Sequence, residues 1–118
     1  MVPVDVPMAP ATRLGMNQIT SGVFESSYGT YEGYRAKEYV VDVQDGRMYQ
    51  IDMFAEFDAY LIVYMPDGVR FENDDGGSGT NALLRVIPYG DGPMRILARG
   101  YRRTPTGEFA VSVRDVTQ

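Results

Sequence analysis

The residues with the clearest chemical potential lie between Phe71 and Asn81, where the sequence reads FENDDGGSGTN. Carboxylate and amide oxygens are the hard ligands of which Ca²⁺ takes roughly six to eight. The side chains that could form such a site are those of Asp58, Asn73, Asp74, Asp75 and Asn81. In the other interpretation, Asn73, Asp74 and Asp75 bond to backbone amides and hold a glycine-rich turn between strands. Both interpretations stay open, so calcium is an option and not a required cofactor.

Standard catalytic and metal motifs do not fit this stretch. Counting from Asn73 or Asp75, the position of the bidentate EF-hand glutamate holds Leu84 or Val86. The chain contains no histidine and no cysteine. Ser-His-Asp triads, imidazole zinc sites and thiolate chemistry are therefore excluded, and we expect a protein that is not an enzyme.

The charge of the chain restricts its partners. The formal net charge is −5 and the pI is about 4.6. An acidic chain repels phosphate backbones, so no nucleic-acid partner is expected. Acids outnumber bases from Ala36 to Asn81, whereas arginines dominate from Arg85 to Arg103. We expect these two segments to face each other across one fold.

Two groups of residues could bind a ligand. Tyr28, Tyr31 and Tyr34 recur at every third position of the loop SSYGTYEGY. Exposed tyrosines offer contact area to proteins and sugars, although they could equally lie as a lid over the sandwich edge. The arginine-rich segment adds Arg99, Arg102 and Arg103 as further candidates.

Short apolar runs separated by Asp-Gly turns predict an all-β chain. We expect an antiparallel, jelly-roll-like sandwich of about eight strands. The first two runs after residue 36 read as a hairpin, and the run from Asp58 is apolar on both faces, which predicts a central strand. The expected strands are Ile19–Phe24, Lys37–Val43, Met48–Phe54, Asp58–Met65, Val69–Glu72, Leu83–Ile87, Pro93–Ala98 and Glu108–Val113.

The domain boundaries follow from length and composition. A chain of 118 residues fits one domain, which we place at residues 15–118. Residues 1–14, rich in proline, alanine and valine, are expected to form an extended, partly disordered leader. This leader is not a signal peptide, because it lacks a basic segment followed by an apolar run. No window has the length of a membrane span.

Several motifs in order resemble the bacterial pre-peptidase C-terminal domain family. They are FDAYL at 57–61, PDG at 66–68, NDDGG at 73–77, Asn81, GPM at 92–94 and GEF at 107–109. The match extends over about Tyr34 to Val113. The sequence departs from the family pattern at Ala82, where serine is usual, and at Met94, where an aromatic is usual.

The resemblance implies a jelly-roll-like fold and an exported, extracytoplasmic protein whose signal peptide is absent from this numbering. It also implies a non-catalytic accessory module that binds a protein or polysaccharide surface. The alternative is a structural or chaperone-like module that assists the folding or secretion of a peptidase and has no ligand of its own. Exposed strand edges would also allow a homodimer, although the sequence does not require one.

Overall fold

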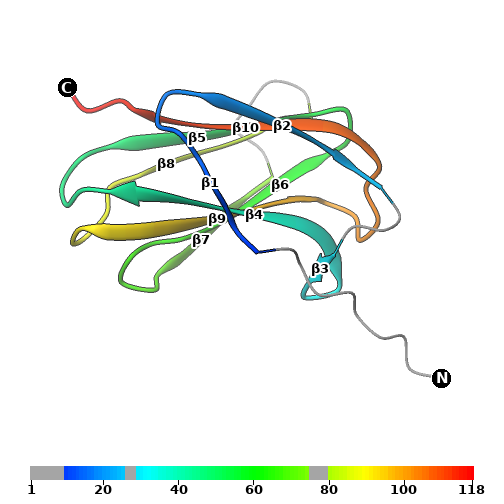
Figure 1. The fold of residues 1–118 in the computed structure, drawn as a ribbon, viewed down its shortest axis with the longest axis horizontal. Helices are drawn as coiled ribbons and strands as arrows, with labels where there is room; N and C mark the ends of the chain where they lie inside the picture. The colour runs from blue at the N-terminus through cyan, green and yellow to red at the C-terminus, as the bar shows by residue number, and fades with distance from the viewer. Residues whose placement is uncertain (1–9, 26–28, 75–79) are drawn as a thin grey trace.

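The computed structural model describes residues 10–25, 29–74 and 80–118, and this part of the chain is all-β. Two sheets pack as two layers, with β5, β10 and β2 above β4 and β9 in Figure 1. The predicted all-β sandwich is therefore confirmed. The strands are β1 (Thr12–Arg13), β2 (Ile19–Phe24), β3 (Thr30–Tyr31), β4 (Tyr34–Val43), β5 (Tyr49–Ala55), β6 (Ala59–Tyr64), β7 (Arg70–Asn73), β8 (Ala82–Val86), β9 (Gly92–Gly100) and β10 (Gly107–Asp115).

The larger sheet has the order β1-β4-β9-β6-β7, with β3 also paired to β4. The smaller sheet has the order β2-β10-β5-β8. All pairings are antiparallel except that of β1 with β4, which is parallel. Each predicted strand occurs, and the short strands β1 and β3 are additional.

The hairpin predicted between the strands now labelled β4 and β5 is wrong. β4 belongs to the larger sheet and β5 to the smaller one, so the connection at Asp45–Gly46 crosses between the layers. Both strands bury an apolar face, and crossing makes these faces meet in the core instead of pointing the same way. The Asp45 side chain holds the crossing by accepting a hydrogen bond from the Gly90 backbone at 2.6 Å.

Alternation along the strands produces the core. Val41 and Val43 from β4 meet Ile51 and Met53 from β5 in one buried apolar cluster. The predicted central strand, β6, lies between β9 and β7. Its residue Ile62 points away from this cluster and is nevertheless fully buried.

The last residues of the expected leader are part of the domain in this structure. Thr12 and Arg13 pair with Tyr39 and Val40 of β4, and the Leu14 side chain is buried in the core cluster. Residues 1–9 lie outside the described part of the chain.

Candidate functional site

A tight hairpin places the tyrosines of the predicted binding loop on the larger sheet. Tyr31 and Tyr34 pair directly, and Glu32 and Gly33 form the turn with φ angles of 54° and 85°. Both angles are left-handed, as a two-residue hairpin turn requires. The turn brings the Tyr31 hydroxyl into a hydrogen bond with the Tyr64 hydroxyl. Tyr28 lies outside the described residues.

Arginines surround the Tyr64 ring on the outer face of the larger sheet. The guanidinium groups of Arg95 and Arg70 lie 5.1 and 5.6 Å from the ring centroid. Each is ion-paired: Arg95 to Glu38, and Arg70 to Glu32 and Glu72, both at 3.1 Å. We call this set the paired cluster; it comprises Tyr31, Tyr64, Arg70, Arg95, Glu32, Glu38 and Glu72.

The other outward-facing arginine on β9, Arg99, has a different environment. The Arg99 guanidinium lies 3.7 Å from the Tyr34 ring centroid and 4.0 Å from that of Tyr60, so two rings enclose it. This arginine is only 8% exposed. Its Nε atom is buried and has no hydrogen-bond partner among the described residues. Register explains the contact with β6, because Tyr60 pairs directly with Arg99.

More arginines gather beside Arg99. The Arg103 guanidinium lies 5.2 Å from the centroid of the same Tyr34 ring. Arg102 is exposed on the β9–β10 loop that also carries Arg103. Arg35 fixes this loop by donating through its guanidinium to the Pro105 carbonyl at 3.0 Å. We call this set the arginine end; it comprises Arg35, Arg99, Arg102 and Arg103 with Tyr34 and Tyr60.

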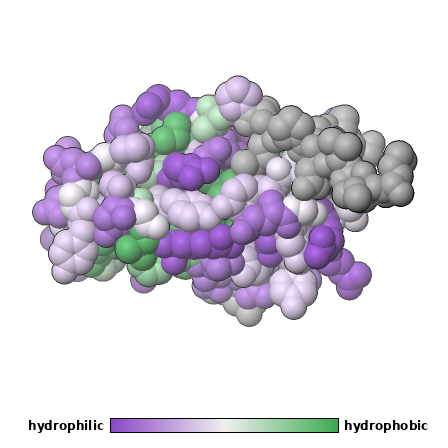
Figure 2. All heavy atoms as spheres, turned by 90° about the horizontal axis from the view of Figure 1, so that it is seen from below, coloured by the Kyte–Doolittle hydropathy of each residue, from purple (hydrophilic) through white to green (hydrophobic). Residues whose placement is uncertain are grey.

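The arginine end lacks the ion pairs of the paired cluster. Within the described part of the chain, none of its four guanidinium groups lies within ion-pair distance of a carboxylate. The expectation that the acidic and basic segments face each other is thus met at Arg95 and Glu38 but not at Arg99. Seen from below, the layer of β4 and β9 presents hydrophilic side chains across the middle of its face (Figure 2). The result is a group of guanidinium groups without a direct ion pair in the described residues, although Glu72, which accepts a hydrogen bond from Tyr60 at 2.8 Å, is close enough for the Arg99 charge to help lower its pKa.

Burial and hydrogen bonding shift the titration of this face. Burial and the bond to Tyr64 raise the pKa of Tyr31 to about 12. Hydrogen bonds from Arg70 and Tyr60 lower the pKa of Glu72. Burial and the bond to Glu72 raise the pKa of Tyr60, and the charge of Asp74 adds to this increase. Asp74 therefore acts electrostatically on Tyr60, the tyrosine that contacts Arg99.

The acidic glycine loop is fixed at both ends by its polar residues. Asn73 donates through Nδ2 to the Leu83 carbonyl at 3.0 Å, which links the two sheets. Asn81 accepts through Oδ1 from the Ala55 amide at 3.1 Å. Thr80 donates to the Ala55 carbonyl and accepts through its own carbonyl from Ala59. Asn73 and Asn81 thus bind backbone groups of neighbouring segments, and the predicted bonds from Asp74 and Asp75 to backbone amides stay a prediction.

The proposed calcium ligands are only partly described. Asp58 is exposed, and Asp74 is half-buried. Asp75 and the loop glycines lie outside the described residues. The part of the chain that the structure describes contains no group of three or more acidic side chains placed to hold a metal ion. The calcium hypothesis stays a prediction.

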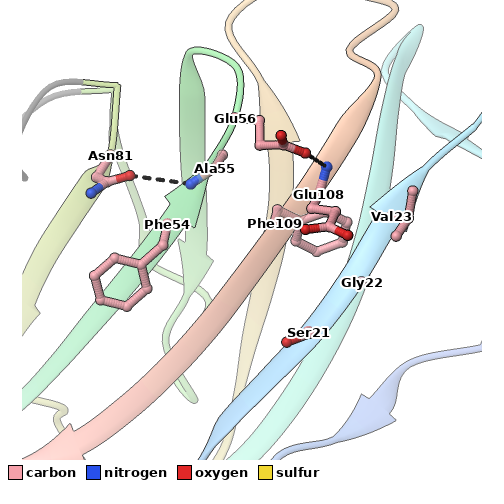
Figure 3. Close-up of a pocket in the computed structure, with 9 residues that line it drawn as sticks. All are labelled: Ser21, Gly22, Val23, Phe54, Ala55, Glu56, Asn81, Glu108 and Phe109. Carbon is pink, nitrogen blue, oxygen red and sulfur yellow. Dashed lines mark hydrogen bonds between the residues drawn. The ribbon is translucent and has the colours of Figure 1, made fainter.

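A groove of about 560 Å³ crosses the outer face of the smaller sheet. In Figure 3, Phe54 of β5 and Val23 of β2 stand on either side of β10, which forms the floor. Glu56 closes one end, where its carboxylate accepts a hydrogen bond from the Glu108 amide at 2.7 Å. The groove was not predicted, because its walls come from strands that are distant in the sequence.

The fold resembles a pre-peptidase C-terminal domain. That of a collagenase from Bacillus anthracis matches with a TM-score of 0.67 at 14% identity, over 93% of this chain and 99% of that one. PliG from Aeromonas hydrophila, a periplasmic inhibitor of g-type lysozyme, matches with a TM-score of 0.65 at 15% identity, over 93% and 99%. No protein-family model matches the sequence, and no curated protein matches it.

Sequence reasoning found part of the arginine end and missed the rest. Tyr34, Arg99, Arg102 and Arg103 were candidates, and the structure brings them together. Tyr31 instead belongs to the paired cluster. Arg35 and Tyr60 were missed, since only the register of β4, β9 and β6 makes them neighbours of Arg99.

In the described residues, no helix is long and apolar enough to cross a membrane.

Proposed function

We propose that this chain is a non-catalytic, extracytoplasmic module whose arginine end binds a carboxylate-rich surface of another protein. The observation that carries the proposal is Arg99, a buried guanidinium with no carboxylate partner among the described residues. Buried charges in proteins are normally paired, because an unpaired charge loses its hydration without compensation. An acidic side chain from a partner would supply the missing charge.

The geometry suits carboxylate recognition. Guanidinium groups bind carboxylates through parallel hydrogen bonds and stack on aromatic rings. Tyr34 and Tyr60 hold Arg99 in one orientation before a partner arrives, so little side-chain entropy remains to be lost. The exposed Arg102 and Arg103 would attract an acidic surface at longer range.

The similar folds support an extracytoplasmic binding module, although they do not identify its ligand. One similar fold belongs to a periplasmic protein that inhibits another protein, and the other to a domain of a collagenase. Both descriptions favour an extracytoplasmic location and a macromolecular partner for this chain. The absence of histidine and cysteine supports the non-catalytic role. The alternative structural or chaperone-like role needs no arginine end, so it leaves Arg99 without an explanation.

Titration calorimetry with poly-L-glutamate as the probe tests the proposal. We expect binding that weakens with added salt and that Arg99→Met reduces at least about tenfold. The double change Arg102→Gln and Arg103→Gln should weaken binding less than Arg99→Met does and should reduce its salt dependence. The matched control is Arg47→Gln, because Arg47 is exposed and already paired with Asp115 at 2.5 Å.

Other probes separate the possible partners. Polygalacturonate carries carboxylates on a sugar chain, so tighter binding to it than to polyglutamate would redirect the proposal from protein to polysaccharide. Dextran serves as the neutral control. The proposal fails if polyglutamate does not bind, or if Arg99→Met and Arg47→Gln have equal effects.

A further inference from the structure

Strand β2 has the chemistry of an interface edge. In the described part of the chain it pairs with β10 alone, so the other side of residues 19–23 has no described partner strand. Its sequence, ITSGVF, contains no charge and no proline. Two of its outward side chains are apolar and well exposed, Ile19 at 68% and Val23 at 45%. Edges of this kind are templates for pairing with another chain.

The other edge strands are guarded. β7, at one edge of the larger sheet, carries Arg70 and Glu72, which are ion-paired at 3.1 Å. β8, at the far edge of the smaller sheet, carries the exposed Arg85. Charged side chains of this kind are how proteins protect edges from unwanted pairing. β2 is thus the one described edge of four or more residues without such protection.

We propose that two copies of this chain pair antiparallel through β2, about a two-fold axis at Ser21. Residues on the same face of an antiparallel pair must lie opposite each other, and this register meets that condition. It sets Ile19 of each copy opposite Val23 of the other, so each exposed apolar side chain gains an apolar cross-strand neighbour. The two smaller sheets become one continuous sheet.

A second copy fits this edge better than an unrelated peptide does. The edge is self-complementary, since Ile19 and Val23 of one copy contact Val23 and Ile19 of the other. An isologous interface needs only this one patch, and it closes without forming a fibre. The chain has a net charge of −5, and the uncharged β2 is a place where two copies can approach with little local repulsion.

The pairing has a consequence for binding. Phe24, at the end of β2, pairs with Gly107, so this end of β2 lies beside the β9–β10 loop that carries Arg102 and Arg103. Two-fold antiparallel pairing therefore directs the two arginine ends in opposite directions. The dimer would bridge two acidic surfaces, a consequence that rests on the proposed function, whereas the pairing itself does not.

Sedimentation equilibrium over a range of concentrations up to about 1 mM tests the pairing. We expect reversible dimers, and the double change Ile19→Lys and Val23→Lys should raise their dissociation constant at least about tenfold. The matched control is Val69→Lys with Ile87→Lys, which adds the same charge at positions 47% and 54% exposed elsewhere. A monomer at every concentration, or equal effects of the two double variants, would overturn the proposal.

Cysteine cross-linking tests the register without weakening the edge. The natural chain has no cysteine, so Ser21→Cys introduces a single thiol. At the two-fold axis the two thiols would face each other within disulfide range, and mild oxidation should give a covalent dimer. Val69→Cys is the exposed control. A dimer formed no faster than by this control would overturn the pairing, while polyglutamate binding by the arginine end would be unaffected in either case.

Discussion

Arg95 and Arg99 lie on the same strand, face the same side of the larger sheet and stack on tyrosine rings. They differ in charge compensation. The Arg95 side chain is 46% exposed and is ion-paired with Glu38. Arg99 is 8% exposed and has no carboxylate partner in the described residues. Water alone could stabilise the exposed Arg95 cation, whereas the buried Arg99 cation is the one that needs a carboxylate partner. Stability alone would therefore favour the opposite distribution of ion pairs. This contrast separates an arginine that maintains structure from one available for binding.

A common apolar floor lies between the two arginines. Leu97 and Ile62 pair across β9 and β6, point outward and are fully buried. They are outside the core cluster between the sheets. The stems and rings of the charged and aromatic side chains above must therefore exclude water from them. Both regions depend on this floor, so it should contribute more to stability than any ion pair above it.

Replacing Ile62 with alanine should have the largest effect on stability. We expect a loss of about 2–4 kcal/mol in the free energy of unfolding, because the change removes buried methyl groups and leaves a cavity. Urea denaturation measures this loss. Ile87→Ala, at a position 54% exposed, is the control and should cost less than about 0.5 kcal/mol. Equal losses would show that the outward face is open to water, and the contrast between the arginines would lose its structural basis.

Replacement by methionine, which preserves much of the side-chain volume, should lower stability more at Arg95 than at Arg99. Arg95→Met leaves Glu38 without its partner, and we expect a loss of about 1–2 kcal/mol. Arg99→Met removes a cation but retains sulfur–aromatic packing between the two rings, so stability should stay within about 1 kcal/mol of the natural chain. Thermal and urea unfolding of both variants measure the difference.

Binding should show the reverse order. Arg99→Met should abolish most of the affinity for polyglutamate, whereas Arg95→Met should leave it nearly unchanged once the protein is folded. If Arg99→Met instead unfolds the protein and Arg95→Met does not, Arg99 is a structural residue and the arginine end is not a binding site.

The strands were predictable because their signals are local. Alternation along β4 and β5 and the Asp-Gly turns between strands indicate each element without reference to the others. The pairing of the strands was harder to predict from the sequence. A short link between two amphipathic strands suits a hairpin and a crossing equally well, and only the need to bury both faces together decides for the crossing at Asp45.

The site was harder to predict for the same reason. Nothing near Arg99 in the sequence indicates that Tyr60 lies against it, because the contact follows from the register of β6 and β9. Charge counts along the chain likewise predicted that acidic and basic segments would meet. They do so at Glu38 and Arg95, which are neighbours through β4 and β9, whereas no described acid lies within ion-pair distance of Arg99.

The acidic glycine loop lies near the arginine end, and the effect of Ca²⁺ on this loop should be the smallest of those predicted. Asn73 and Asn81 already hold backbone groups, and Asp58 is exposed, so we expect the melting temperature to be the same in excess EDTA and in millimolar Ca²⁺. A ligand at a hundredfold excess over its dissociation constant would add about 2.7 kcal/mol, a shift of several degrees for a domain of this size. Such a shift, abolished by Asp74→Asn, would establish a calcium site. It would also mean that the bound cation neutralises the Asp74 carboxylate, whose charge contributes to the raised pKa of Tyr60 beside the arginine end. Carboxylate binding by Arg99 should then become stronger with calcium, and without a shift it should not change.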